Sequence, residues 1–152
     1  MISYGIAALL IIIIDQITKI LISSSFTSTT VIHLIPGLFN IVYLKNTGAA
    51  FSMFSDHVDI LGIISAVFCI GVIIYCIIAK PKNKLQRISL MLIFAGALGN
   101  AIDRIFRGFV IDFIETAFIN FPVFNIADIA ITVGAFLLVI YVIFFDREPK
   151  EK

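Results

Sequence analysis

Residues 96–128, GALGNAIDRIFRGFVIDFIETAFINFPVFNIAD, carry polar side chains that an otherwise apolar chain does not accommodate cheaply. Two aspartates in this stretch, Asp112 and Asp128, have apolar neighbours and no basic residue beside them. Burying a carboxylate without a partner costs a large amount of free energy. We therefore expect the rest of the chain to be built around these two side chains.

The composition indicates an integral membrane protein. Hydrophobic residues make up 61% of the 152 residues and charged residues only 14%, against roughly 25% charged in a typical soluble domain. A net charge of +1 and the lack of a basic stripe with interleaved aromatics argue against a nucleic-acid partner. Cys69 and Cys76 lie in one apolar run, at a spacing that fits neither a redox pair nor a zinc cluster. We expect no metal and no cofactor.

Four apolar segments are long enough to cross a bilayer, which takes about 20 helical residues. They cover residues 2–22, 58–79, 88–106 and 126–145 of a single integral membrane domain, 1–152. Basic residues crowd the link between the second and third segments and the tail after the fourth: Lys80, Lys82, Lys84 and Arg87, then Arg147, Lys150 and Lys152. By the positive-inside rule, that link and both termini are cytoplasmic, and segments 23–57 and 107–125 face outward.

Asp15 and Lys19 interrupt the first apolar segment. This segment lacks a basic leader and a small-residue cleavage site, so we expect a retained helix rather than a signal peptide. An aspartate near a helix centre costs about 2.5–3.5 kcal/mol on the insertion scale, but a lysine four residues on lies on the same face and can pair with it. The pair could lock the first helix against its neighbours, support a functional site, or do both.

The outer segments predict a small antiparallel sheet on the membrane surface. VIHLI and LFNIVYL read as strands separated by the turn residues Pro36 and Gly37. Asn46 follows in KNTGAAFSMF, where Gly48, Ala49 and Ala50 would let a ligand approach the backbone. Residues 110–114 are a further short extended stretch, in which Asp112 alternates with Ile111 and Phe113. The fold class is therefore an all-α four-helix membrane bundle with a small sheet outside the membrane.

The third and fourth helices bring further polar groups to the outer half of the membrane. Asn100 lies about 18 Å along the helix axis from its start, and Asp103 is expected to pair locally with Arg104. Gly96 leaves room for close helix packing. We expect Gly108 to end the third helix and Asn125 to lie near the N-cap of the fourth.

The polar side chains thus gather in the outer half of the membrane, and this placement favours chemistry at the membrane surface. A transporter with Asp15 as its coupling group would distribute polar residues across the membrane, and a non-catalytic assembly or chaperone subunit is the other alternative. The sequence has no Ser or Cys near a plausible base and no His or Cys metal cluster. A pair of catalytic aspartates is the arrangement that remains for such chemistry. Two close carboxyl groups in a poorly solvated site share one proton. One then accepts a proton from water attacking an amide while the other donates to the carbonyl oxygen.

Five blocks in one order resemble the motifs of bacterial lipoprotein signal peptidase, the type II signal peptidase family. They are DQITK, NTGAAFS, GALGNAIDR, VIDFI and FNIADIAI, and the resemblance spans residues 15 to about 134. It implies an aspartic endopeptidase of the bacterial plasma membrane that removes the signal peptide from prolipoproteins, cutting just before the diacylglyceryl-modified cysteine. It also implies a four-helix bundle with a β-cradle on the outer side.

The resemblance assigns roles to particular residues. Asp112 and Asp128 match the catalytic dyad, and Asn46, Asn100 and Arg104 match residues that line the site and hold the substrate backbone. Supporting positions are matched by Asp15, Lys19, Gly96 and Asn125. The implied partners are diacylglyceryl-prolipoproteins and membrane lipids, and we expect a functional monomer without a cofactor.

Overall fold

The computed structural model describes residues 2–48 and 58–146, and it confirms the predicted fold class. Most of the NTGAAFS block and the basic residues of the tail lie outside the described residues. The elements in chain order are α1 (Ile2–Ser25), β1 (Ile32–Ile35), β2 (Phe39–Asn46), α2 (Val58–Ala79), α3 (Lys84–Arg107), β3 (Val110–Thr116) and α4 (Ile126–Phe144). All four helices are long and apolar enough to cross a membrane.

Hydrogen bonds accompany the helix ends that differ most from the expected ones. α1 continues to Ser25, and the backbone N–H of Phe26 still donates to the carbonyl of Ile22 at 2.9 Å. α3 begins at Lys84 rather than at residue 88, because the Asn83 side chain accepts the first free backbone N–H groups. The C-cap of α3 is Gly108, with a left-handed φ of 73°, as the sequence predicted.

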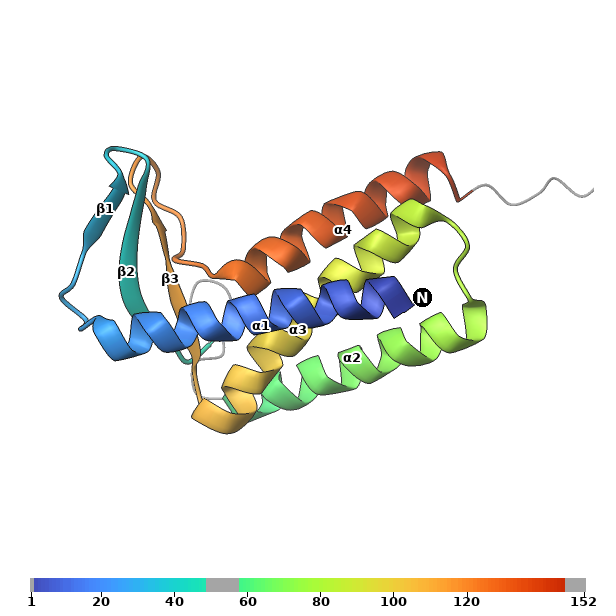
Figure 1. Ribbon diagram of the computed structural model, residues 1–152, viewed down its shortest axis with the longest axis horizontal. Coiled ribbons are helices and arrows are strands. Elements are labelled where there is room, and N and C mark those ends of the chain that lie inside the picture. The colour runs from blue at the N-terminus through green and yellow to red at the C-terminus, as the bar shows by residue number, and fades with distance from the viewer. Residues whose placement is uncertain (1, 49–57, 147–152) are drawn as a thin grey trace, which may run out of the picture.

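α3 is the central helix of the bundle. It packs against each of the other three helices, as Figure 1 shows. In its membrane-spanning part 44% of the residues are buried, against 17% in each of the other helices. α1, α2 and α4 therefore present most of their surface to lipid, while α3 carries the polar residues of the interior.

Glycines allow α3 and α4 to approach closely. A Cβ added at Gly96 would lie 2.2 Å from the carbonyl oxygen of Ala127, and one at Gly134 would lie 2.9 Å from the backbone nitrogen of Ile93. Both distances are too short for a side chain. The close contact brings the start of α4 against the middle of α3, where Asn100 lies.

The sheet lies at one end of the molecule, opposite the link between α2 and α3 (Figure 1). Its strand order is β1-β2-β3, and both pairings are antiparallel. Leu44 pairs with Asp112 and Asn46 with Val110, so Asn46 and Asp112 lie on the same face of the sheet as diagonal neighbours. This register directs two predicted site residues to one place.

Candidate active site

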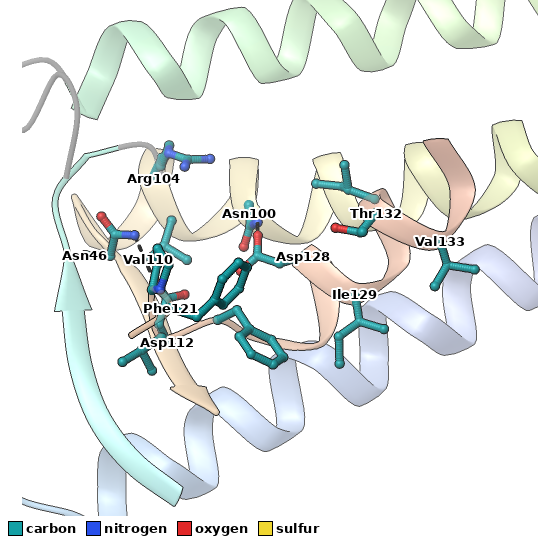
Figure 2. Close-up of a pocket in the computed structure, with 14 residues that line it drawn as sticks. Asn46, Asn100, Arg104, Val110, Asp112, Phe121, Asp128, Ile129, Thr132 and Val133 are labelled. Carbon is teal, nitrogen blue, oxygen red and sulfur yellow. Dashed lines mark hydrogen bonds between the residues drawn. The ribbon is translucent and has the colours of Figure 1, made fainter. Parts of the chain in front are cut away.

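All five residues predicted for catalysis or substrate binding line one pocket of about 430 Å³ (Figure 2). β3 and the start of α4 contribute the two aspartates, the end of β2 contributes Asn46, and α3 contributes Asn100 and Arg104. The other lining residues are mostly apolar: Val110, Phe121, Pro122, Val123, Phe124, Ile129, Ile131, Thr132 and Val133. The pocket is thus a largely apolar cavity with a few convergent polar groups, the usual form of a ligand site.

Asp112 is 1% exposed, and each of its oxygens accepts one amide hydrogen bond. Asn46 Nδ2 donates to Oδ2 at 2.8 Å, and Asn125 Nδ2 donates to Oδ1 at 2.7 Å. Burial raises the pKa of Asp112 to about 6, and the nearby Asp128 carboxylate also raises it, while the two amide donors oppose the rise. Asp112 can therefore hold a proton at a pH where an exposed aspartate is ionised.

Asp128 lies in the first turn of α4 and completes a capping box with Asn125. Its Oδ2 accepts the backbone N–H of Asn125 at 3.1 Å, and Asn125 Oδ1 accepts the backbone N–H of Asp128 at 3.0 Å. Asp128 Oδ1 accepts a further bond from Asn100 Nδ2 at 2.7 Å. The helix-end role expected for this aspartate is thus present, and the same side chain also lines the pocket.

Lys19 fixes the orientation of the Asn100 amide. Lys19 Nζ lies 2.9 Å from Asn100 Oδ1, and because an ammonium group can only donate, the amide oxygen must face it. Asn125 Nδ2 also donates to this oxygen, at 3.1 Å. The nitrogen of Asn100 is then left to donate to Asp128.

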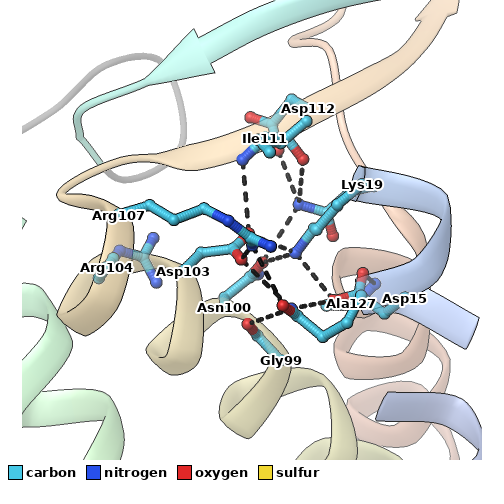
Figure 3. A network of polar contacts seen from close by, with 12 residues as sticks. Asp15, Lys19, Gly99, Asn100, Asp103, Arg104, Arg107, Ile111, Asp112 and Ala127 are labelled. Atoms are coloured by element: carbon cyan, nitrogen blue, oxygen red, sulfur yellow. Dashed lines mark hydrogen bonds and ion pairs between the residues drawn. The ribbon is translucent and has the colours of Figure 1, made fainter. Parts of the chain in front are cut away.

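A buried ion network lies behind the pocket (Figure 3). Lys19 is fully buried and pairs with Asp15 at 2.9 Å and with Asp103 at 2.8 Å, and Arg107 also pairs with Asp103. Two cations thus face two carboxylates, so the network is close to neutral. Asp15 Oδ1 accepts the backbone N–H of Ala127 at 3.0 Å, which ties α1 to the start of α4. The predicted Asp15–Lys19 pair is present and does lock the first helix in place.

The expected local pair between Asp103 and Arg104 is wrong. Adjacent residues on a helix point about 100° apart, so Asp103 faces Lys19 on α1 while Arg104 lines the pocket. Arg104 Nη2 donates to the carbonyl oxygen of Gly48 at 3.3 Å and takes no part in the ion network (Figure 3). Arg104 is thereby available to a ligand in the pocket.

Two members of the network were missed from the sequence. Arg107 pairs with Asp103, and its i, i+4 spacing from that residue could have revealed it. Gln16 donates to Asp103 Oδ1 and to the carbonyl of Gly99, both at 3.2 Å, and accepts from Arg107. No local pattern marks Gln16, because all its partners except the adjacent Asp15 lie on α3.

The fold and the site together fit a class: a multi-pass membrane protease with two aspartates in one pocket, Asp112 buried and Asp128 half-buried. The family model described as Signal peptidase (SPase) II matches residues 7–144. The chain therefore belongs to the signal peptidase II family.

Relatives and solved structures agree with this assignment over nearly the whole chain. The lipoprotein signal peptidase of Fusobacterium nucleatum is 38% identical, over 95% of this chain and 88% of the relative. That of Lactobacillus johnsonii is 41% identical, over 95% of this chain and 94% of the relative. A bacterial membrane enzyme solved by the in meso method at 2.3 Å resolution superposes with a TM-score of 0.89 at 33% identity, covering 99% of this chain and 94% of that one.

Proposed function

We propose that the chain removes the signal peptide from diacylglyceryl-modified prolipoproteins, cutting just before the lipidated cysteine, with Asp112 and Asp128 as the catalytic pair. Removal of signal peptides from prolipoproteins is the activity of the family to which the chain belongs. The observation that supports the residue assignment is the placement of both carboxyl groups on one pocket, each held by amide donors.

The pair works with one proton between its two carboxyl groups. The ionised group accepts a proton from water as the water attacks the scissile amide carbon, and the protonated group donates to the carbonyl oxygen. A pKa of about 6 for Asp112 keeps that shared proton available close to neutral pH. Four hydrogen bonds, three from side-chain amides and one from the Asn125 backbone N–H, hold the two carboxyl groups in place before the substrate arrives.

Arg104 is positioned to bind the substrate backbone, and Asn46 lines the same pocket while it holds Asp112. Arg104 Nε is buried and, within the part of the chain that the structure describes, has no hydrogen-bond partner. A buried donor without a partner is costly, and a peptide carbonyl in the pocket would supply the acceptor. Asn46 Oδ1 accepts the N–H of Gly48 at 2.9 Å, which directs its Nδ2 toward Asp112. Since one chain supplies every polar group of the pocket, a monomer suffices.

The distribution of basic residues supports a pocket on the outer side of the plasma membrane. The basic link between α2 and α3 lies at the opposite end of the molecule from the sheet (Figure 1), and basic links stay in the cytoplasm. Both termini are then cytoplasmic too. Ile129, Thr132 and Val133 extend the pocket along α4, where the lipid chains of a prolipoprotein would remain in contact with the bilayer.

The substrate must be extended where it is cut, because a helical backbone hides its amide groups. β2 and β3 already pair with each other from Asn46 and Val110 to Phe39 and Thr116. Phe124 occupies the other edge of β3 at Ile114. The backbone N–H and carbonyl of Ile111 on that edge are also engaged, by Asp103 Oδ2 and Asn125 Nδ2, both at 3.4 Å. An unwound signal peptide would therefore lie extended across the pocket beside Asp112, with its backbone within reach of Asn46 and Arg104 rather than paired along β3. A complex with a helical scissile bond would contradict this arrangement.

A transporter that uses Asp15 has less support. Asp15 is 1% exposed and is bound by Lys19 and by the Ala127 N–H. It does not line the pocket. A coupling group has to exchange its proton or ion with solvent, and Asp15 is instead held within the ion network.

The substrate assignment is tested with purified chain in detergent and one prolipoprotein in two forms, with and without the diacylglyceryl group. Mass spectrometry of the products should show cleavage of the modified form immediately before its lipidated cysteine, with the unmodified form left intact. Cleavage elsewhere, or equal cleavage of both forms, would contradict the proposed substrate. An intact modified precursor would contradict the proposed activity.

A further inference from the structure

A second pocket, of about 420 Å³, lies away from the candidate active site, in a groove between α1 and α2. Both helices pack against α3, but they make little contact with each other, so α3 forms the floor of the groove. It runs along residues 4–12 of α1 and 87–98 of α3, about 12 and 16 Å at 1.5 Å per residue. That is about the depth of one leaflet of a hydrocarbon core roughly 30 Å thick.

The walls of the groove are apolar except at one end. Leu9, Ile73 and Phe94 line its length, and Gly5 and Ala8 keep the α1 wall low. A Cβ added at Gly5 would meet nothing within 4 Å, so there is open space beside this glycine. Apolar walls of this length suit a hydrocarbon chain.

Arg87 marks the polar end of the groove. Its guanidinium lies 6.0 Å from the ring centre of Tyr4, across the groove on α1. Nε donates to the carbonyl of Pro81, and no described residue forms an ion pair with Arg87, so its terminal NH₂ groups can bind an anion. Lys80, Lys82 and Lys84 precede it in a stretch without acidic residues. Basic pockets between membrane helices are typical sites for anionic lipid headgroups.

We propose that this groove binds one anionic glycerophospholipid, with an acyl chain between α1 and α2 and its phosphate at Arg87. Charge selects this occupant: Arg87 lines the groove at the end where Lys80, Lys82 and Lys84 lie, and none of the described residues that line it is acidic. The placement of this lipid in the cytoplasmic leaflet rests on the proposed orientation, but its binding does not.

Native mass spectrometry of the full chain tests the headgroup. Phosphatidylglycerol and phosphatidylcholine with identical acyl chains are titrated separately, and the first bound lipid is quantified. Phosphatidylglycerol should bind about five-fold more tightly, the effect of one basic group near a phosphate. Arg87→Gln should abolish this preference, whereas Lys45→Gln, which removes a charge from the sheet at the other end, should keep it. Equal binding of the two lipids by the unsubstituted chain, or an unchanged preference in Arg87→Gln, would overturn the proposal.

A pair of glycine variants tests the groove itself. An added Cβ meets nothing within 4 Å at either Gly5 or Gly71, so Leu should be tolerated at both, but only Gly5 lines the groove. Gly5→Leu should weaken the binding of both lipids by about ten-fold, as expected for a few displaced methylenes. Gly71→Leu should leave both affinities unchanged. Similar lipid affinities in the two variants would contradict binding of the lipid in this groove. Asp112→Asn should bind lipid normally. A failure of lipid binding in the groove can therefore be distinguished from a failure of the proposed cleavage.

Discussion

The side-chain amide of Asn125 donates to Asp112 Oδ1 at 2.7 Å. The same side chain caps α4, with its Oδ1 accepting the backbone N–H of Asp128 at 3.0 Å. Asn can do both because its amide carries a donor and an acceptor. One residue therefore sets the orientation of Asp112 and the position of the helix that carries Asp128.

Serine in place of Asn125 should separate these two roles. Asn125→Ser keeps a good helix cap but is too short to reach Asp112. We expect kcat to fall by about 10- to 100-fold, the worth of a hydrogen bond to a charged group. Asn125→Ala should lose the same activity and a further ~1 kcal/mol of unfolding free energy with the cap. Steady-state kinetics and thermal unfolding check this, and a fully active Ser variant would contradict it.

Lys19→Met should destabilise the fold by about 3–5 kcal/mol, because it leaves Asp15 and Asp103 buried without their shared cation. It should also slow cleavage at temperatures where the variant is folded, since the Asn100 amide loses the group that orients it. Unfolding in detergent measures the first effect. Lys82→Met, at an exposed position, is the matched control and should change stability by no more than ~0.5 kcal/mol. Equal losses in the two variants would exclude a structural role for Lys19.

Gly96→Ala should separate α3 from α4. The added methyl group would lie 2.2 Å from the Ala127 carbonyl oxygen, and forced overpacking typically costs about 1–3 kcal/mol. Activity should fall as well, because Ala127 precedes Asp128. Gly71→Ala, where the methyl group meets nothing within 4 Å, should leave both properties intact or stabilise the helix slightly. A Gly96→Ala protein with normal melting temperature and activity would be evidence against the close contact.

Asp112 should make stability depend on pH. Its pKa is about 6 in the folded chain and about 3.9 when unfolded, so the folded state binds the proton more tightly between these values. Proton binding by Asp112 therefore stabilises the folded state by up to about 3 kcal/mol. This stabilisation is fully present below pH ~4 and is lost as the pH rises through ~6. Asp112→Asn cannot ionise and should lack this slope. Unfolding free energies of both proteins from pH 4 to 7 check the difference, and parallel curves would contradict the raised pKa.

Much of the fold and the pocket could be predicted because the determining patterns are local. Hydropathy gave the four helices, and the spacing of Asn125 and Asp128 gave the cap. The start of α3 was set too late because hydropathy does not register a polar cap such as Asn83.

Partners that lie far apart in the chain could not be predicted. Asp103 was assigned to its neighbour Arg104, whereas it pairs with Lys19 on α1. No local pattern fixes the rotation of one helix against another, so the sequence alone could not choose between these cations. The same holds for Gln16, whose partners are all on α3 apart from Asp15.

The central claim, that Asp112 and Asp128 catalyse cleavage together, is tested most directly by the cleavage rate of a diacylglyceryl-modified prolipoprotein. The rate is measured for Asp112→Asn, for Asp128→Asn and for the control Asp146→Asn, whose exposed side chain at the end of α4 bonds only Tyr141 among the described residues. We predict that each of the first two variants remains folded and loses at least about 10²-fold in rate, as expected for a general acid–base group, while the control keeps full activity. Undiminished cleavage by either Asp112→Asn or Asp128→Asn would contradict the account.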